Sequence, residues 1–423
     1  MSEEKQKFDL VPVHGGLPEP VDRTTRLVDR SHLLREAVTM PQVRILPADL
    51  STLYRFADGG LSPLEGPMTG REWHRSLDDG TVESKGEKYA WTIPMSFPVT
   101  GREAKALTPG SVAALCNERG EVVGILEDID VFEWDKRKFV ESVYATDRLD
   151  HPGGRIVERD ERSTLVGGRL KALPQPVNSD FGRYQLSPIS TRLLIKERKW
   201  ERALAFQTRN PLHRAHEYAL VAGAERLTKS GFFTGVVLNP LVGQLKGDDL
   251  PAETRMRCYR VLKERQLLGE GDCDPEIWDR AGYQINEVFE LIALDIKMYY
   301  GGPKEAVMHG IYRQNYGFTD LVIGRKHADA PFEDGTPIWG DFDAQEVFDK
   351  IPGKLAIEPC KIGFAAFYES LGRVDLTENH PDEKPVAVSG SEVRRLLGEG
   401  VRPDPRILRA EVADILIETY KAS

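Results

Sequence analysis

The chain has 423 residues, enough for two or three domains, and its 40% hydrophobic and 29% charged content is typical of a globular protein. The formal net charge of −10 leaves no excess of basic residues to neutralise a nucleic-acid backbone, so nucleic acid is excluded as the main partner. A small anionic substrate is not excluded, because a basic pocket can exist within an acidic protein.

The N-terminal segment and the cysteines indicate the cellular setting. No apolar signal segment follows Met1, and no stretch approaches the length of a membrane span, so we expect no membrane association. The four cysteines (Cys116, Cys258, Cys273 and Cys360) are scattered without a CxxC pair. This spacing disfavours disulfides and a cysteine-rich zinc site, and it favours a cytoplasmic location.

Short apolar runs, broken by Gly, Pro and Asp clusters, occupy the chain from about residue 27 to residue 186. Their length and their punctuation predict a mostly β domain with a few helices. Three of these runs are Val43–Leu46, Ala90–Pro94 and Val122–Leu126.

From Trp200 onward, apolar runs of strand length alternate with segments of helical periodicity, which predicts a doubly wound α/β sheet. The expected strands cover residues 203–206, 234–238, 289–296 (a buried parallel strand) and 319–323, and the expected helices begin at 211, 252 and 301–303. The segment 375–385 is rich in Asp, Glu, Asn and Pro and is interpreted as a link to a small helical tail.

The segment Gln207–His216 is the most informative part of the sequence. Pro211 suits the first position of a helix and Asn210 suits its N-cap, so we expect a helix to start there. His213 and His216 are then three residues apart on one face of the opening turns. Because helix N-termini attract anions, this strand, polar turn and helix start predict an anion site for a phosphate chain.

Other polar clusters have simpler alternatives. Two histidines three apart can bind zinc, but zinc helices use HExxH spacing or add cysteines, so no metal site is predicted. The cluster Gly324–Ala328 follows a predicted strand and is expected beside the Gln207 segment, although a solvated turn is the alternative. Ser389 with Glu392 forms a capping-box pattern, interpreted as structural, and Lys246–Asp249 is interpreted as a solvated charged loop.

Taken together, the motifs resemble those of the ATP sulfurylase (sulfate adenylyltransferase) family along nearly the whole chain. The family signature QTRNPxHxxH is intact from Gln207 to His216, and Gly-Arg-x-His stands at 324–327. Further matching motifs are Ser62-Pro63-Leu64-x-Gly66, Val143–Asp147, His151-Pro152-Gly153, Asn239–Gly243, Lys246–Asp248, Thr254-Arg255, Gly302–Ala306, Asn315–Gly317 and Ser389–Ser391.

The resemblance implies an α/β protein of three domains: an N-terminal PUA-like β-rich domain (1–190), a Rossmann-like nucleotidyltransferase catalytic domain (191–370) and a small C-terminal α-rich domain (371–423). It implies the reversible conversion of MgATP and sulfate into adenosine 5′-phosphosulfate and pyrophosphate, by direct in-line attack at the α-phosphate. Mg²⁺ enters as MgATP, and no tightly bound protein metal, nucleic acid or membrane partner is expected. We also expect a homo-oligomer, the common form of soluble enzymes.

The same resemblance assigns roles to the site residues. Gln207 and Arg209 bind sulfate, with the backbone at Ala328 as a third contact, while His213 and His216 hold the β- and γ-phosphates and stabilise the departing pyrophosphate. The catalytic residues that it implies are Thr208, Arg209, Asn210, His213 and His216. The nucleotide-binding residues that it implies are Gln207, Thr208, Arg209, Asn210, Gly324, Arg325, Lys326 and His327.

Three departures from the family pattern qualify the resemblance. Lys326 replaces the usual Asp and adds a positive charge that could tighten the binding of pyrophosphate or product. The Lys variant resembles bacterial enzymes that serve sulfur oxidation, in which the reaction runs towards ATP. Only Cys273 remains where some bacterial members have a zinc-binding cysteine cluster. No Gly-x-x-x-x-Gly-Lys-Ser/Thr motif occurs, so a fused adenosine-phosphosulfate kinase domain is not expected.

Two other functions stay open at this point. Another adenylyltransferase of the helix-histidine type is the first alternative, but it predicts a plain H/T-x-G-H motif without Gln-x-Arg-Asn-Pro. A non-catalytic nucleotide-binding protein, or one that binds RNA through its β-rich half, is the second. The acidic net charge and the intact cluster at 207–216 disfavour it.

Overall fold

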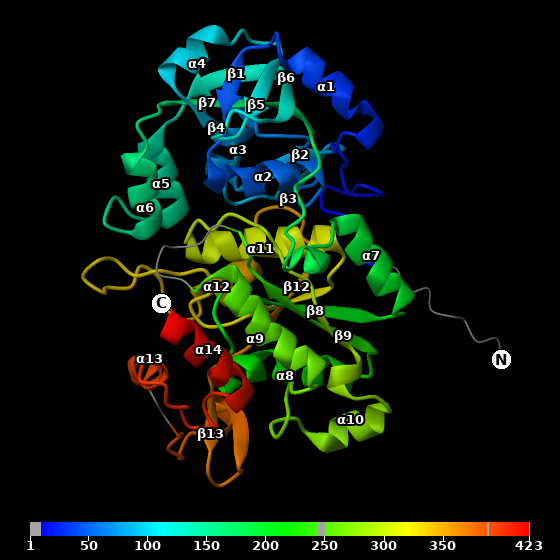
Figure 1. Cartoon of the computed structure of the whole chain (residues 1–423), viewed down its shortest axis with the longest axis vertical. Coiled ribbons are helices and arrows are strands. Elements are labelled where there is room, and N and C mark those ends of the chain that lie inside the picture. The colour runs from blue at the N-terminus through cyan, green and yellow to red at the C-terminus, as the bar shows by residue number, and fades with distance from the viewer. Residues whose placement is uncertain (1–9, 244–249, 387–388, 423) are drawn as a thin grey trace, which may run out of the picture.

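The structure is a computed structural model that describes residues 10–243, 250–386 and 389–422 (Figure 1). An N-terminal unit, a central α/β unit and a C-terminal segment follow one another along the long axis of the molecule. Within the described residues, no helix combines the length and the apolar character needed to cross a membrane. The Lys246–Asp249 motif lies outside the described residues.

The N-terminal unit is built on a five-stranded sheet of order β1-β5-β6-β7-β4, in which β1 runs parallel to β5 and the other neighbours are antiparallel. The strands are β1 (Gln42–Arg44), β4 (Phe97–Val99), β5 (Ala113–Cys116), β6 (Val122–Glu133) and β7 (Thr164–Ala172), with a separate hairpin of β2 (Thr81–Ser84) and β3 (Glu87–Ala90). The helices are α1 (Arg30–Ala37), α2 (Pro47–Ala57), α3 (Gly70–Asp79), α4 (Gly101–Ala106), α5 (Lys136–Tyr144) and α6 (Pro152–Arg159).

Two of the three apolar runs expected in this unit are strands, and the third is not. Val122–Leu126 opens β6, and Val43 lies in β1. The run Ala90–Pro94 is not a strand beyond its first residue, because β3 ends at Ala90 and the next residues form a buried loop. In that loop the Trp91 indole donates to the Ile93 carbonyl (2.9 Å), so a side chain takes the place of a ladder partner.

The central unit contains a five-stranded sheet of order β10-β9-β8-β11-β12, parallel throughout. Its strands are β8 (Arg202–Thr208), β9 (Thr234–Pro240), β10 (Phe289–Leu291), β11 (Asp320–Ile323) and β12 (Glu358–Lys361). Numbered by sequence, this order is 3-2-1-4-5, the doubly wound arrangement of a Rossmann-like fold. The expected α/β architecture is confirmed, although β10 is shorter than the strand predicted over 289–296.

Helices connect and cover these strands: α7 (Pro188–Glu197), α8 (Arg214–Lys229), α9 (Ala252–Glu264), α10 (Pro275–Ala281), α11 (Gly302–Tyr316) and α12 (Asp343–Glu346). The helices predicted from 252 and from 301–303 are confirmed as α9 and α11. Gly317 ends α11 in the left-handed conformation (φ 95°), which glycine adopts without a steric penalty.

The C-terminal segment contains an antiparallel hairpin of β13 (Ala365–Tyr368) and β14 (Arg373–Leu376), followed by α13 (Gly390–Gly398) and α14 (Ala410–Ala422). Short 3-10 turns complete the described structure at Leu27–Asp29, Gly182–Tyr184, Ile285–Glu287, Val347–Lys350 and Thr377–Asn379. The link interpreted at 375–385 therefore begins inside a strand, because β14 pairs with β13 across a tight turn. At α13, the Ser389 hydroxyl accepts the Glu392 amide (3.1 Å), as the capping pattern predicts, while the Glu392 carboxylate pairs with Arg395 instead.

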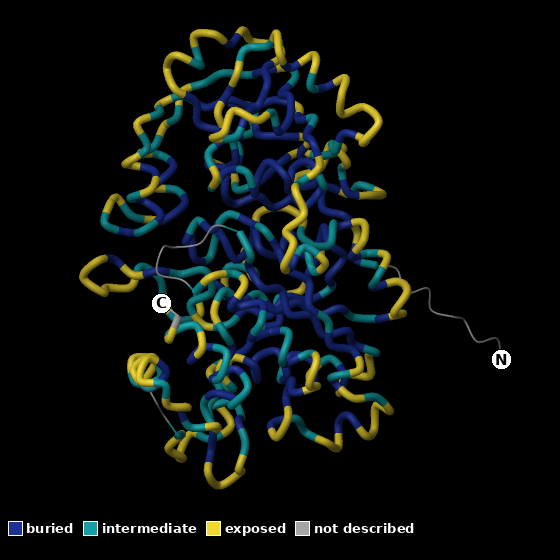
Figure 2. Tube along the Cα trace, viewed as in Figure 1, coloured by how far each residue is buried: buried dark blue, intermediate teal, exposed yellow. Residues whose placement is uncertain are grey.

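Two apolar clusters pack on opposite faces of the central sheet. In β8, Ala203 and Ala205 lie in the cluster shared with the N-terminal unit, and Leu204 and Phe206 lie in the cluster shared with the C-terminal segment. The alternation follows from the two-residue period of a strand. Figure 2 shows buried residues running through both sheets, while α13 is largely exposed. Both faces of β8 are thus held in place, which fixes the position of its carboxyl end.

Candidate active site

A cavity of about 400 Å³ lies at the carboxyl ends of β8 and β11. These strands are neighbours at the centre of the sheet, where the strand order reverses, and ligands of doubly wound sheets bind at this point. The cavity is lined by all of the predicted site residues, namely Gln207, Thr208, Arg209, Asn210, His213, His216, Gly324, Arg325, Lys326, His327 and Ala328. The structure therefore brings the two predicted clusters together, as expected.

The cavity also has walls that the sequence interpretation missed: Phe206, Ala215, Ala219, Met298, Tyr300, Asp329, Gly363, Phe364 and Ala365. Phe364 follows the carboxyl end of β12. Because ligands of such sheets bind beyond the carboxyl ends of the strands, this position could have been found from the sequence. Met298 and Tyr300 lie in an irregular segment after β10 that carries no motif, and only the tertiary structure places them here.

Gln207 and Arg209 offer polar atoms that no other described residue engages. Gln207 lies near the end of β8, Arg209 lies in the bend that directly follows the strand, and both line the cavity. Gln207 Oε1 and Arg209 Nη1 are buried without a hydrogen-bond partner in the described part of the chain. The Arg209 guanidinium lies 5.3 Å from the centre of the Tyr300 ring. A buried donor or acceptor without a partner is costly; an anion would satisfy the Arg209 donor, and a water molecule would satisfy the Gln207 acceptor.

The backbone around the cavity is locally strained. Of eight non-glycine residues with a left-handed φ in the described chain, three line this cavity: Tyr300 (φ 58°), Lys326 (φ 49°) and Ala328 (φ 56°). Such conformations cost about 1–3 kcal/mol each and concentrate at functional sites. The Ala328 carbonyl accepts the Gly302 amide (3.1 Å), so the strained loop is tied to the start of α11.

The helix after β8 begins later than the sequence predicts. The N-cap is His213 rather than Asn210, and Pro211 precedes the helix. The His213 ring Nδ1 accepts the His216 amide (3.2 Å), and that bond replaces the expected Asn210 cap. The Asn210 carbonyl is instead held by the Thr208 hydroxyl (2.9 Å) and the Tyr259 hydroxyl (2.8 Å), which shape the turn before the helix.

His213 and His216 form a stacked pair facing the cavity. Their ring centres are 4.3 Å apart with an interplanar angle of 12°. Burial lowers the pKa of both rings, and the neighbouring His216 ring lowers that of His213 further. Because the His216 amide is already bonded to His213, the pair presents ring nitrogens to the cavity more than free backbone amides.

The positive side chains of the second cluster are only partly neutralised. Arg325 lies 3.2 Å and Lys326 lies 3.8 Å from the same carboxylate of Asp341, so two cations share one anion. The Arg325 guanidinium also covers the Phe364 ring at 4.2 Å. Asp329 is the carboxyl in the cavity wall, and burial raises its pKa. The rim of the cavity is therefore net positive, which suits an anionic ligand.

His327 is held from behind by buried side chains of α11. His309 Nδ1 lies 2.9 Å from His327 Nε2, and His309 Nε2 lies 3.5 Å from Glu305. The Glu305 carboxylate accepts the backbone amides of Tyr299 (2.8 Å) and Gly301 (3.0 Å). Glu305 and His309 are each 1% exposed; His309 contacts the His327 ring from behind, and the Glu305 carboxylate fixes the backbone on either side of Tyr300.

The buried histidine pair makes stability depend on pH. Burial lowers the pKa of His309 well below 6.5, and Arg313 adds to the effect. The unfolded chain takes up a proton at His309 below about pH 6.5 while the folded chain does not, so the free energy of unfolding should fall as the pH falls. Between pH 7 and pH 5, the free energy of unfolding of a His309→Asn variant is expected to fall less than that of the wild type. The difference is at most about 1.4 kcal/mol per pH unit. Urea unfolding across this range measures the difference, and parallel curves would contradict it.

Arg313 is a buried cation next to this pair. It is 0% exposed, its Nε donates to Asn239 Oδ1 (3.4 Å), and Nη1 and Nη2 have no partner among the described residues. Burial lowers its pKa to about 9. Because an uncompensated buried charge is costly, Arg313→Met should raise the free energy of unfolding, by on the order of 1 kcal/mol.

Chemical denaturation of Arg313→Met measures this change in the free energy of unfolding, with a second buried arginine, Arg55, as the comparison. Arg55 is also buried but pairs with Asp58 at 2.6 Å, so Arg55→Met leaves a carboxylate unpaired and should destabilise the fold. A loss of stability in both variants would show that Arg313 is compensated in solution.

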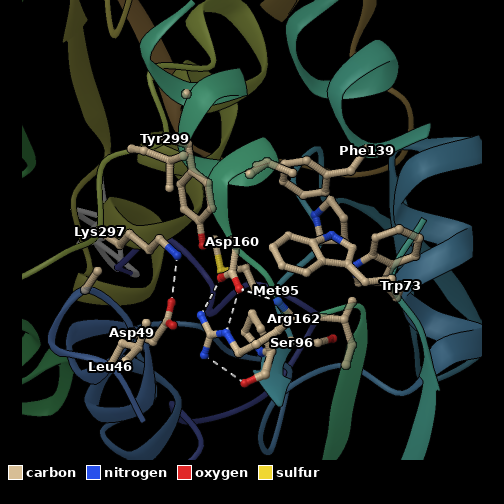
Figure 3. Close-up of a pocket in the computed structure, with 18 of the residues that line it drawn as sticks. Leu46, Asp49, Trp73, Met95, Ser96, Phe139, Asp160, Arg162, Lys297 and Tyr299 are labelled. Carbon is tan, nitrogen blue, oxygen red and sulfur yellow. Dashed lines mark hydrogen bonds and ion pairs between the residues drawn. The ribbon is translucent and has the colours of Figure 1, made fainter. Parts of the chain in front are cut away.

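A second cavity, of about 260 Å³, lies between the N-terminal and central units (Figure 3). Its cations are already neutralised: Lys297 lies 2.6 Å from Asp49, and Arg162 donates to Asp160 (2.8 Å). The cavity shares Met298 and Tyr300 with the first, so the irregular segment after β10 separates the two. Since its charges are paired internally, the second cavity is the weaker candidate for an anion site.

Comparison with known proteins identifies the family. The family model described as ATP-sulfurylase matches residues 182–419, which is more than half of the chain. The chain belongs to the ATP-sulfurylase family. A second family model, described as a PUA-like domain, matches residues 11–175. The expected PUA-like character of the N-terminal unit is thereby confirmed.

Curated relatives extend the likeness over the full length. A sulfate adenylyltransferase of Pyropia yezoensis is 49% identical, covering 98% of both chains. Those of Synechococcus sp. (strain JA-3-3Ab) and Halothermothrix orenii are 34% and 32% identical, over 98% and 97% of this chain and 97% and 99% of theirs. Among solved structures, the hexameric APS kinase from Thiobacillus denitrificans matches with a TM-score of 0.70 at 19% identity, covering 97% of this chain and 68% of that one. This last likeness supports the fold.

Across the described ranges, no group of three or more His, Cys, Asp or Glu side chains is arranged to hold a metal ion. The paired histidines of the cavity are accompanied by Arg209 and Lys326, whose charge suits an anion more than a cation.

Proposed function

We propose that this protein is a sulfate adenylyltransferase, which joins sulfate to the AMP part of MgATP and releases pyrophosphate. The observation that carries the proposal is the buried Arg209 Nη1, which has no hydrogen-bond partner among the described residues, beside two stacked histidines in the cavity at the strand switch point. The family membership and the curated relatives support it. The product is adenosine 5′-phosphosulfate, and the same site runs the reaction in both directions.

Sulfate binds at the end of β8 in this proposal. Gln207 Nε2 and the Arg209 guanidinium donate to its oxygens, and the backbone at Ala328 supplies a third contact. The stacking of Arg209 on Tyr300 orients the guanidinium plane. Thr208 and Asn210 act at the reacting centre by shaping the turn, since the Thr208 hydroxyl is bonded to the Asn210 carbonyl.

The nucleotide occupies the remainder of the cavity. His213 and His216 contact the β- and γ-phosphates, and Arg325, Lys326 and His327 with Gly324 border the nucleotide. Mg²⁺ is part of the substrate MgATP and reduces the charge of the triphosphate. As a sulfate oxygen attacks the α-phosphorus, the bond from that phosphorus to the bridging oxygen breaks, and its electrons leave with pyrophosphate, stabilised by the two histidines.

The chemistry requires positioning and charge stabilisation rather than a general base, because sulfate is fully ionised near neutral pH. Two like charges about 4 Å apart repel by roughly 4 kcal/mol at an effective dielectric of 20. Arg209, the cationic loop at 325–326 and Mg²⁺ offset this repulsion, as in other phosphoryl transfers. No serine or cysteine nucleophile is needed.

The wider expectations stay predictions. We infer a cytoplasmic location, which the four unpaired cysteines support. The domain limits at 190 and 370, a homo-oligomeric state and the absence of nucleic-acid and membrane partners are likewise proposed.

A pyrophosphate-release assay tests the function. The full chain is incubated with ATP and Mg²⁺, with sulfate or molybdate added in parallel reactions. Release of pyrophosphate that depends on the oxyanion is the expected result. Absence of release with either anion would overturn the proposal, and binding of ATP without turnover would then favour the non-catalytic alternative.

A further inference from the structure

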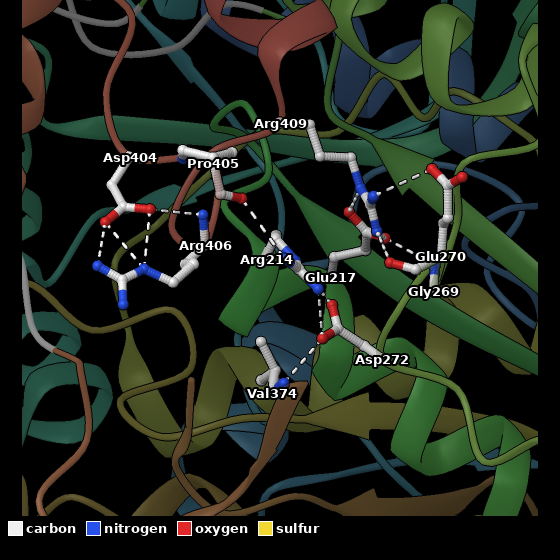
Figure 4. Close-up of polar contacts among 10 residues, drawn as sticks. All are labelled: Arg214, Glu217, Gly269, Glu270, Asp272, Val374, Asp404, Pro405, Arg406 and Arg409. Carbon is white, nitrogen blue, oxygen red and sulfur yellow. Dashed lines mark hydrogen bonds and ion pairs between the residues drawn. The ribbon is translucent and has the colours of Figure 1, made fainter. Parts of the chain in front are cut away.

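The first turn of α8 has two sides with different surroundings. His213 and His216 line the cavity, whereas Arg214 and Glu217, the residues that directly follow them, contact other segments of the chain. Successive residues of a helix are about 100° apart. A rotation of this turn would therefore move the two histidines and the pair Arg214 and Glu217 at the same time. Figure 4 shows Arg214 and Glu217 in a network with residues from the loop after α9 and from the C-terminal segment.

Glu217 is the more buried anchor. It is 1% exposed, and its carboxylate accepts Arg409 Nε (2.9 Å) and Nη2 (2.7 Å) in a two-point contact. The Gly269 amide donates to the same carboxylate (2.6 Å), and Arg409 Nη2 also reaches the Glu270 carbonyl (3.0 Å). Three segments of the chain therefore meet at one buried carboxylate.

Arg214 is the second anchor, and it points away from the cavity. It forms a two-point contact with Asp272 (2.9 and 2.6 Å), whose carboxylate also accepts the Val374 amide of β14 (2.7 Å). The Arg214 amide, the first of the helix, donates to the Ile407 carbonyl (2.8 Å). A helix N-terminus that could face an anion is thus partly occupied by the C-terminal segment.

We propose that the C-terminal segment around Arg409, together with Asp272, positions His213 and His216 for the reaction. Arg409 and Asp272 are positioning residues: they touch no substrate and act through Glu217 and Arg214. The inference rests on the proposed function, because it assigns the histidines to the phosphates of ATP. Gln207 is held separately, by the pairing of β8 with β9, and Arg209 directly follows the last paired residue of that strand.

This separation gives the proposal a kinetic signature. A loosened α8 misplaces the histidines that contact the β- and γ-phosphates but leaves the sulfate contacts on β8 in place. We therefore expect the KM for ATP to rise and kcat to fall, while the KM for sulfate stays the same. A merely structural role lowers the fraction of folded protein, which reduces kcat and moves neither KM.

The test compares three variants of the full chain at a temperature where circular dichroism shows them folded. Arg409→Met removes the contact with Glu217, and Arg409→Lys keeps one charge. Arg402→Met is the control, since Arg402 pairs with Asp414 (2.6 Å) on the exposed side of the same segment. Arg409→Met should lose roughly 10–100-fold in kcat with a raised KM for ATP, because a misplacement of about 1 Å has such an effect. Arg409→Lys should recover part of this, and the control should match the wild type.

Unchanged kinetics in folded Arg409→Met, or a fall in kcat with both KM values unchanged, would overturn the proposal. If Arg409→Met does not fold, Asp272→Asn takes its place. The side-chain oxygen of the new asparagine can still accept the Val374 backbone amide, but the negative charge that holds Arg214 is lost. Calorimetric titration with inorganic pyrophosphate separates the two hypotheses. If the wild type has no turnover, the proposed function fails. A several-fold weaker affinity of Arg409→Met for pyrophosphate would still support the positioning of the two histidines, and an affinity equal to that of the wild type would refute it.

Discussion

Replacing Arg209 by alanine should reduce pyrophosphate release by at least about 10²–10³-fold, the effect of removing one preorganised donor to developing charge. Arg209 forms no ion pair with another described residue, and one of its guanidinium nitrogens is buried without a partner. Its removal therefore breaks no structural contact other than the stacking on Tyr300. The midpoint of thermal unfolding should stay close to that of the wild type.

Two further variants make this result specific. Arg209→Lys keeps the charge but loses the planar fork of donors, so it should recover only a small part of the activity. Arg183→Ala removes a similar arginine that stacks on Tyr184 at 4.8 Å outside the cavity, and it should leave turnover unchanged. Wild-type turnover in folded Arg209→Ala would show that the guanidinium does not contact sulfate.

Replacing His213 by asparagine should reduce turnover by about 10²-fold or more, because a ligand of the leaving pyrophosphate is lost. Asparagine is a favourable N-cap, so it can accept the His216 amide in place of the ring and preserve the start of α8. The loss of activity can then be assigned to the imidazole. His213→Ala should lose a similar factor in turnover and, in addition, about 1 kcal/mol of stability from the missing cap.

Steady-state turnover and urea unfolding of these two variants, measured side by side, separate the two roles of His213. His74→Asn serves as a control for the loss of an imidazole, since His74 contacts the Gly70 carbonyl within α3, far along the chain from the cavity. Equal turnover in His213→Asn and the wild type would refute the assigned contact with pyrophosphate.

The architecture of the central unit could be predicted because its signals are local. The apolar run at 203–206 is continuous since β8 is buried on both faces, and the alternation of such runs with helical periodicity leads to a parallel sheet. The topological rule for that sheet then brings Gln207 and Gly324 to one edge. The helical period predicted that both histidines share one face, but His213 is the N-cap before α8, and the bond from the His216 amide sets its place.

The start of α8 was predicted wrongly for a physical reason. Asn210 and Pro211 have the right local preferences, but the Asn210 carbonyl is held by Tyr259 from α9, and the Arg214 amide is held by Ile407. These partners lie about 50 and about 190 residues away in sequence, and local propensities contain no information about them. The same holds for Tyr300, which enters the cavity wall through the contacts of Glu305 with the segment around it.

By itself, the sequence determined the strand and placed the two histidines close to the start of the helix that follows it, since residue type and hydrophobic pattern decide these over a few neighbouring positions. Only the tertiary structure shows which of the two arginines in the motif is already paired. Arg214 is drawn away by the buried carboxylate of Asp272, while Arg209 has Tyr300 beside it and no such carboxylate among the described residues. Charge pairing at a distance in sequence thus leaves Arg209 available for the proposed anion, because a guanidinium already matched to a carboxylate has little left to offer a ligand.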